Sequence, residues 1–107
     1  ENLPQLDECD NFAVDGDAIF DLTIQSENIL SQLSNDNFTI SYHETEDDAI
    51  NNTNGILIPE TYDNIEAFSQ TIFFRYFENT YPECYQVSSF VLNTLSPPEI
   101  ITCTTIF

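Results

Sequence analysis

The charge of this chain is almost entirely of one sign, and this constrains its fold more than any other feature. Nineteen Asp and Glu residues stand against one arginine, Arg75, and no lysine, which gives a formal net charge of −18 over 107 residues. Self-repulsion on this scale destabilises a compact state, so bound cations or high salt should stabilise the fold. The imbalance leaves no cationic patch for nucleic-acid phosphates or an anionic membrane, and we expect neither partner.

Enough apolar residues are present to build one small core despite this charge. Hydrophobic residues make up 41% of the chain and aromatic residues 13%, including nine Phe and five Tyr. The longest apolar runs, such as residues 71–74, are far too short to cross a bilayer. The sequence therefore predicts one folded domain of ordinary size.

Apolar residues alternate along several short segments in the way that half-buried strands require. In residues 18–23, Ala18, Phe20 and Leu22 share one face, while residues 70–77 are apolar on both faces and predict a central strand. The expected strands are 18–23, 37–43, 56–58, 70–77 and 85–95. This pattern predicts an all-β fold, an immunoglobulin-like antiparallel β-sandwich.

Two segments between these strands predict one or two short helical turns. Residues 24–33 carry Ile29, Leu30 and Leu33 at helical spacing. In residues 44–50, Thr45 followed by Asp48 has the capping-box spacing, and acids favour the first turn of a helix.

Three cysteines allow three pairings, and strand length ranks them. A final strand over 85–95 would cover roughly 35 Å, placing Cys84 at one end of the sandwich and Cys103 beyond the other. We expect the first strand to begin at the end where Cys84 lies, so Cys9–Cys84 is the predicted disulfide and Cys103 is left free. Three reduced thiols are the alternative.

The densest acidic segment follows Cys9 and is a candidate calcium site. Asp10, Asp15, Asp17 and Asp21 supply carboxylates, and Gly16 allows a turn among them. Calcium prefers six to eight oxygen ligands from a flexible loop of this kind. The segment lacks the alternating register of an EF-hand, and the alternative is a solvated acidic loop.

The sequence offers no convincing catalytic group. The single histidine, His43, lies on a predicted strand and is interpreted as a surface residue at the strand end, and no zinc-type spacing surrounds it. We expect no enzymatic activity. Arg75 is interpreted as an internal counter-ion for a carboxylate such as that of Asp21 or Glu78.

The two ends of the chain share a short motif that predicts tandem repetition. Pro4, Leu6 and Cys9 are matched at a constant offset of 94 residues by Pro98, Ile100 and Cys103. We therefore expect residues 1–97 to form one repeat module, and residues 98–107 to be a linker and the start of a following repeat.

The motifs in order along the chain resemble a repeat of large flavobacterial surface proteins that are exported by the type IX secretion system. The matching pieces are Leu6-x-x-Cys9-Asp10, Asp15-Gly16-x-Ala18-x-Phe20-Asp21-Leu22-Thr23, Ile29-Leu30, Tyr42-His43-Glu44-Thr45, Asp48-Ala49, Asn54-x-Ile56, Gln70-Thr71-Ile72-x-x-Arg75, Cys84-Tyr85 and Phe90-x-Leu92. The resemblance implies an immunoglobulin-like tandem module with a spacer or adhesive role in adhesion or gliding motility. It also implies the Cys9–Cys84 pairing and the repeat period. One departure is that Phe12-Ala13-Val14 interrupts the acidic run after the first cysteine.

These observations predict a stiff acidic spacer of a long extracellular or cell-surface protein, stabilised by calcium. The expected partners are neighbouring repeats, surface polysaccharide or another cell-surface protein. A carbohydrate-binding module is the first alternative, with Tyr62, Tyr81 and Tyr85 as candidate ligand-binding residues. An acidic DNA-mimic inhibitor is the second, and it would require reduced cysteines and a cytoplasmic location.

Overall fold

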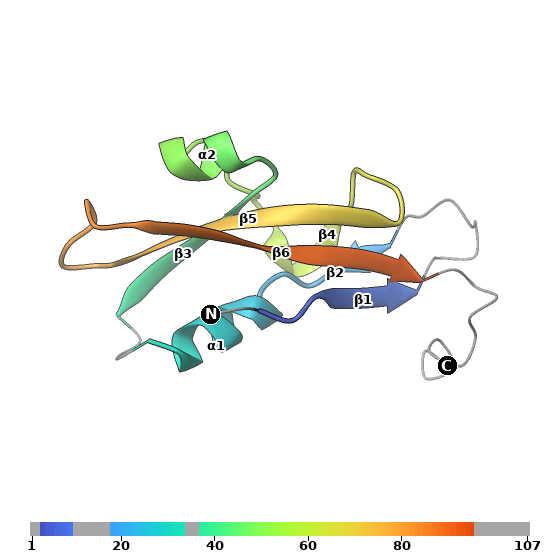
Figure 1. Cartoon of the computed structure of the whole chain (residues 1–107), viewed down its shortest axis with the longest axis horizontal. Helices are drawn as coiled ribbons and strands as arrows, with labels where there is room; N and C mark the ends of the chain where they lie inside the picture. Colours follow the sequence, from blue (N-terminus) through green and yellow to red (C-terminus); the bar gives the residue numbers. More distant parts are fainter. Residues whose placement is uncertain (1–2, 10–17, 34–36, 96–107) are drawn as a thin grey trace.

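A four-stranded sheet forms the larger layer of the fold, in the order β1–β6–β5–β3 (Figure 1). The computed structural model describes residues 3–9, 18–33 and 37–95. Along the chain the elements are β1 (Leu6–Cys9), β2 (Ile19–Phe20), α1 (Ile24–Ser31), β3 (Phe38–His43), α2 (Glu46–Asn51), a 3-10 turn (Pro59–Thr61), β4 (Tyr62–Asp63), β5 (Ser69–Glu78) and β6 (Gln86–Leu95).

The register of the large sheet is continuous over its two longest strands. β5 and β6 form an antiparallel hairpin from Ser69 opposite Asn93 to Tyr76 opposite Gln86, and β3 pairs antiparallel with β5. At the far edge, β1 runs parallel to β6. β2 and β4 pair antiparallel in a second, two-stranded sheet. The order β6–β5–β3 corresponds to strands G, F and C of an immunoglobulin sandwich, with β2 and β4 in the places of B and E. The prediction of an all-β, sandwich-like fold is confirmed.

The core lies between the large sheet and a layer made of β2, β4 and α1 (Figure 1). Phe20, Leu22 and Ile72 are fully buried, and Ala18 and Phe74 are nearly so. Each fully buried large side chain contributes about 1.5–3 kcal/mol relative to its exposed state. The alternation in residues 18–23 therefore identified the inward face correctly.

The helix predicted from the capping motif is confirmed as α2. The Thr45 Oγ1 accepts a hydrogen bond from the Asp48 amide at 3.1 Å, and Thr45 is the N-cap. The helix ends at Asn52, whose φ of 57° is left-handed and closes the last turn. The helix predicted within residues 24–33 is α1.

Two predicted strands differ from the structure. Only Ile19–Phe20 of the 18–23 segment pairs as a strand, because the Asp21 carboxylate accepts hydrogen bonds from the amide and hydroxyl of Thr23 and turns the chain into α1. Residues 56–58 form no strand: the Leu57 side chain is 93% exposed, and the segment leads directly into the 3-10 turn. None of the helices in the described ranges is long and apolar enough to cross a membrane.

Candidate functional site

The turn between β5 and β6 presents Cys84 at the end of a long hairpin. Cys84 is exposed and is a free thiol. Its amide donates to the Tyr81 carbonyl at 3.0 Å, and the Tyr81 amide donates to the Glu78 carbonyl at 2.8 Å. The Asn79 amide donates to the Asn37 carbonyl at 2.9 Å, which ties the turn to the start of β3. The hairpin therefore holds the Cys84 backbone in one place at the tip.

Arg75 connects the base of this turn to α2. Its Nη1 donates to the carbonyls of Ala49 at 3.1 Å and Ile50 at 2.9 Å, and its guanidinium carbon lies 3.8 Å from the centroid of the Tyr85 ring. The arrangement caps the negative end of the helix dipole and adds a cation–π contact beside Cys84. The prediction that Arg75 acts as a counter-ion for a carboxylate is wrong. Among the described residues, its guanidinium contacts two backbone carbonyls and the Tyr85 ring.

The other described cysteine backbone lies at the opposite end of β6. Cys9 is the last residue of β1 and is opposite Leu95 in the parallel register, whereas Cys84 precedes Gln86 (Figure 1). The strand Gln86–Leu95 covers about 30 Å, and a disulfide requires Cα atoms about 4.4–6.8 Å apart. The sequence argument assumed that β1 begins at the Cys84 end. In the observed register, β1 ends at the opposite end of β6 from Cys84. Cys9 and Cys84 of one chain are therefore too far apart to form the predicted disulfide.

The loop before β5 exposes two apolar side chains close to that end of the sheet. Ile65 is 65% exposed and Phe68 is 41% exposed. The Phe68 carbonyl accepts from the Thr94 amide at 2.8 Å, which places the loop beside the last residues of β6. We call Ile65 and Phe68 the apolar seat. Sequence reasoning missed it, because neither residue shows a periodic pattern that separates exposed from buried positions.

A buried polar network supports the apolar seat from inside. The Gln70 Oε1 accepts from the amides of Ile65 at 2.7 Å and Glu66 at 3.2 Å, and its Nε2 donates to the Tyr62 hydroxyl at 2.8 Å. That hydroxyl donates to the Glu44 carboxylate at 2.8 Å. Burial, together with the neighbouring Glu44, raises the pKa of Tyr62, so the hydroxyl keeps its proton and remains a donor.

The structure does not bring the three candidate tyrosines together. Tyr62 is buried in β4 with its hydroxyl engaged, whereas Tyr81 and Tyr85 lie at the hairpin turn. The Tyr85 ring also lies against the Arg75 guanidinium. A row of exposed aromatic rings, which a glycan module would need, is therefore not assembled from these residues.

Most of the candidate calcium site lies outside the described residues, because Asp10, Asp15 and Asp17 fall within residues 10–17. Asp21 is described, and its Oδ1 accepts from the Thr23 amide at 3.0 Å and the Thr23 hydroxyl at 2.5 Å. In residues 3–9, 18–33 and 37–95, no three His, Cys, Asp or Glu side chains cluster as a metal site would require.

The interpretation of His43 as a surface residue is wrong, because it is 1% exposed. Its Nδ1 donates to the Thr53 carbonyl at 2.8 Å, and its Nε2 lies 2.8 Å from the Ser41 hydroxyl, which is then the donor. Both ring nitrogens are occupied, so the ring links β3 to the segment after α2. This is a structural role.

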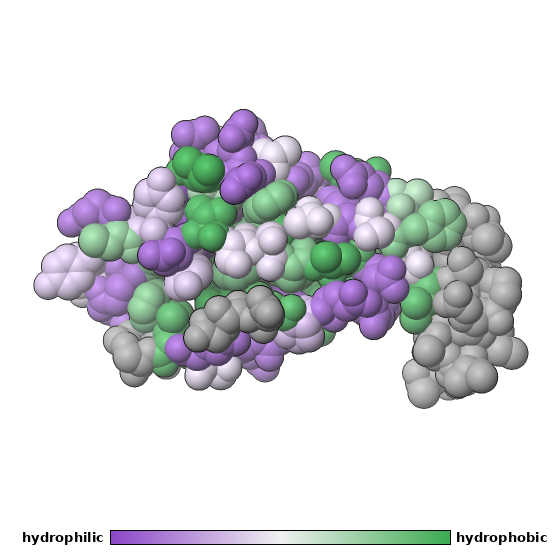
Figure 2. Space-filling view, viewed as in Figure 1, coloured by the Kyte–Doolittle hydropathy of each residue, from purple (hydrophilic) through white to green (hydrophobic). Residues whose placement is uncertain are grey.

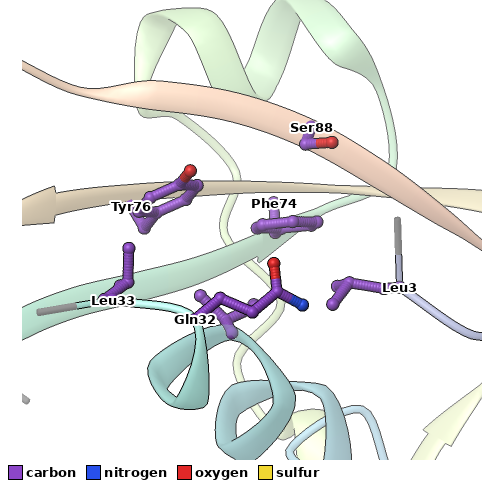
Figure 3. Close-up of a pocket in the computed structure, with 7 residues that line it drawn as sticks. Leu3, Gln32, Leu33, Phe74, Tyr76 and Ser88 are labelled. Atoms are coloured by element: carbon purple, nitrogen blue, oxygen red, sulfur yellow. The ribbon is translucent and has the colours of Figure 1, made fainter. Parts of the chain in front are cut away.

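A shallow pocket lies between α1, the N-terminal segment and the large sheet (Figure 3). Its lining consists of Leu3, Ile29, Gln32, Leu33, Phe74, Tyr76 and Ser88. None of these side chains is charged at neutral pH, and none is a preferred metal ligand. Figure 2 shows that hydrophilic side chains gather instead over α2, on the other side of the sheet.

The comparisons with known proteins assign the chain to a family. No curated protein and no solved structure is significantly similar to it. The sequence model of the Flavobacterium inter-domain disulphide bond domain, however, matches residues 5–98, which include every described strand and helix. The chain is a structural domain of flavobacterial proteins and belongs to the Flavobacterium inter-domain disulphide bond domain family.

Proposed function

We propose that this chain is a non-enzymatic structural unit of a long secreted or cell-surface protein, coupled covalently to an adjoining domain through Cys84. The observation that carries the proposal is the position of Cys84, exposed at the tip of an ordered hairpin and separated by the length of β6 from the end of β1. The family description names a disulfide between domains, which agrees with a thiol that faces outward.

The location follows from the chemistry of the bond. Disulfides persist in oxidising environments outside the cytoplasm, so the coupled unit belongs to an extracellular or surface protein. A chain of such units, each carrying a net charge of −18, repels itself and extends, which suits a spacer that projects other parts in adhesion or gliding motility.

The proposal is tested by mapping disulfides in the native protein that carries this chain. Surface protein from the flavobacterial source is alkylated without reduction, digested, and analysed by mass spectrometry. The expected product joins the Cys84 peptide to a peptide from a different domain. An alkylated, free Cys84 in the mature surface protein would overturn the proposal, as would a bond between Cys84 and Cys9 of the same unit.

Calcium stabilisation is a separate part of the proposal, carried by the four carboxylates of Asp10, Asp15, Asp17 and Asp21. Melting curves are compared in EDTA, in calcium, and in magnesium at equal ionic strength. Calcium at 100 times its dissociation constant should add about 2.7 kcal/mol to the free energy of unfolding. An equal rise in both salts would mean that only screening of the net charge stabilises the fold.

A further inference from the structure

We infer that the Thr94 hydroxyl attacks the side-chain amide of Gln70 within one copy of the domain, forming an internal ester bond and releasing ammonia. The two side chains lie on the buried face of neighbouring strands, Gln70 on β5 and Thr94 on β6. Gln70 is 3% exposed and Thr94 is 5% exposed. The bond involves neither a cysteine nor a second copy, so the inference is independent of the bond proposed for Cys84.

The Thr94 hydroxyl is a buried polar group without a hydrogen bond. Its Oγ1 has no partner among the residues that the structure describes, and the Arg75 Nε is the only other buried side-chain nitrogen or oxygen there of which this is true. Leaving a buried hydroxyl unpaired costs free energy, so an unpaired one requires an explanation. A threonine that bonds covalently through this oxygen supplies one, because an ester no longer has a hydrogen to donate.

The Gln70 carbonyl is polarised in the way that favours attack on its carbon. Its Oε1 accepts from the backbone amides of Ile65 at 2.7 Å and Glu66 at 3.2 Å. Two backbone amides that converge on one carbonyl oxygen stabilise the negative charge that develops on it in a tetrahedral intermediate. The loop before β5 therefore holds this side-chain amide as an oxyanion hole holds an acyl group.

The nitrogen that must leave is held as well. The Gln70 Nε2 donates to the Tyr62 hydroxyl at 2.8 Å, and that hydroxyl donates its own proton to the Glu44 carboxylate at 2.8 Å. Burial raises the pKa of Tyr62, so the hydroxyl stays protonated and its oxygen remains the acceptor for Nε2. The orientation of the leaving nitrogen is thus fixed from the side of β4.

The register brings the hydroxyl and the side-chain amide to the same end of the hairpin. Gln70 is opposite Leu92, and Thr94 lies two residues further along β6, where its amide donates to the Phe68 carbonyl at 2.8 Å (Figure 1). Diagonal neighbours on one face of an antiparallel pair lie about 7–8 Å apart, within reach of a long side chain. The Gln70 side chain extends toward this end, because the amides that bind its oxygen precede Phe68 in the chain.

The reaction exchanges one acyl bond for another and needs no oxidant or cofactor. The Thr94 Oγ1 forms a bond to the Gln70 Cδ, and the bond between Cδ and Nε2 breaks. The hydroxyl proton is transferred to Nε2, which leaves as ammonia. Well-oriented groups in one molecule react as though each were present at about 10⁵–10⁸ M. Burial of both side chains also excludes the water that would hydrolyse the ester.

The ester fastens the open end of the β5–β6 hairpin. The turn after Glu78 already joins the two strands at one end, and the new bond joins them again near the other, at Gln70 and Thr94. A pull on the C-terminal end of β6 then cannot separate it from β5 without breaking a covalent bond.

Trypsin digestion of the whole chain tests the inference, because Arg75 lies between the two residues and the chain has no lysine. Cleavage of the reduced, denatured protein gives residues 1–75, which contain Gln70, and residues 76–107, which contain Thr94. We expect the two pieces to stay joined, with a mass that is lower than their sum by one ammonia. Mild alkali should then separate them and leave a carboxylate side chain at position 70.

Three variants identify the groups that react. Thr94→Val keeps the buried shape and removes the hydroxyl, so its pieces should separate. Thr71→Val is the matched control, because Thr71 is an exposed threonine of β5, and its pieces should stay joined. Tyr62→Phe removes the oxygen that orients the leaving nitrogen and should slow the appearance of joined pieces by about tenfold or more. Melting curves establish that each variant is folded.

The wild-type digest decides the matter whether or not a variant folds. Two separate pieces from native protein incubated at mildly acid and mildly alkaline pH would overturn the inference. Loss of ammonia with separate pieces would overturn it too, since ring closure at Asn54-Gly55 changes the mass equally without joining them. Joined pieces from Thr94→Val would assign the bond to another pair of side chains. Because the protein is reduced before digestion, none of these outcomes depends on the partner of Cys84.

Discussion

Replacing Arg75 should destabilise the domain, because the guanidinium of this single Lys or Arg residue joins β5 to α2 and to the Tyr85 ring. Arg75→Met keeps the length of the side chain and removes the guanidinium. Two hydrogen bonds from a charged donor to the Ala49 and Ile50 carbonyls are lost, together with the contact to the Tyr85 ring.

The size of the effect follows from these contacts. A hydrogen bond involving a charged group contributes about 1.5–3 kcal/mol when it is shielded, and a partly exposed cation–π contact about 0.5–1 kcal/mol. The bond to Ile50 is exposed and the bond to Ala49 is part-buried, so we expect a total near 2–3 kcal/mol rather than the full sum. For a domain of this size that lowers the melting temperature by about 10–20 °C.

The assay is thermal and urea unfolding of the wild type and the variant at low and high salt. Thr71→Glu is the matched control: it lies exposed on the same strand and also brings the net charge to −19, without removing a contact. If both variants lose the same stability, and salt restores both, then Arg75 acts through net charge and the capping argument is refuted. A loss specific to Arg75→Met, reduced when Tyr85→Leu is already present, supports it.

Two further predictions concern polar groups that organise loops. Gln70→Leu removes the acceptor of the Ile65 and Glu66 amides, so both amides should exchange hydrogen faster and the free energy of unfolding should fall by about 1–3 kcal/mol; unchanged exchange would contradict the assignment. The pKa of Asp48 is lowered by hydrogen bonds from Asn54, Thr53 and Thr45, so its contribution to stability is present above its unfolded pKa and is lost as the pH falls through its folded pKa. Asp48→Asn should therefore flatten the acid side of a stability–pH curve below about pH 4, and an unaltered curve would contradict this.

The elements that could be predicted from the sequence are those specified by local patterns. The apolar run of β5, the length of β6 and the Thr45 cap of α2 each depend on residues close together in the chain. The alternation of Ala18, Phe20 and Leu22 predicted the buried face, although only Ile19–Phe20 pairs as a strand. Local competition explains the difference, because the Asp21 side chain bonds the Thr23 backbone instead of allowing the strand to continue.

The features that were missed depend on contacts between distant residues. Nothing local in Leu6–Cys9 indicates that β1 runs parallel to β6, and that one pairing moves Cys9 to the other end of the sheet from Cys84. His43 was interpreted as exposed because its partner, the Thr53 carbonyl, comes ten residues later, after α2. The Arg75 partners are likewise carbonyls, which every residue carries and no sequence pattern marks.

The high negative charge explains why a covalent bond between adjoining domains would be needed. Two adjoining copies would each carry a net charge of −18, and with one arginine and no lysine in each they can form almost no ion pairs across a contact. Screening weakens that repulsion only beyond about 8 Å at physiological salt, and domains joined by a disulfide lie closer than that at their junction. A disulfide, in contrast, is independent of ionic strength once formed, so an acidic array linked in this way should keep its junctions from low salt to sea-water salt, where a purely non-covalent array would separate in dilute buffer.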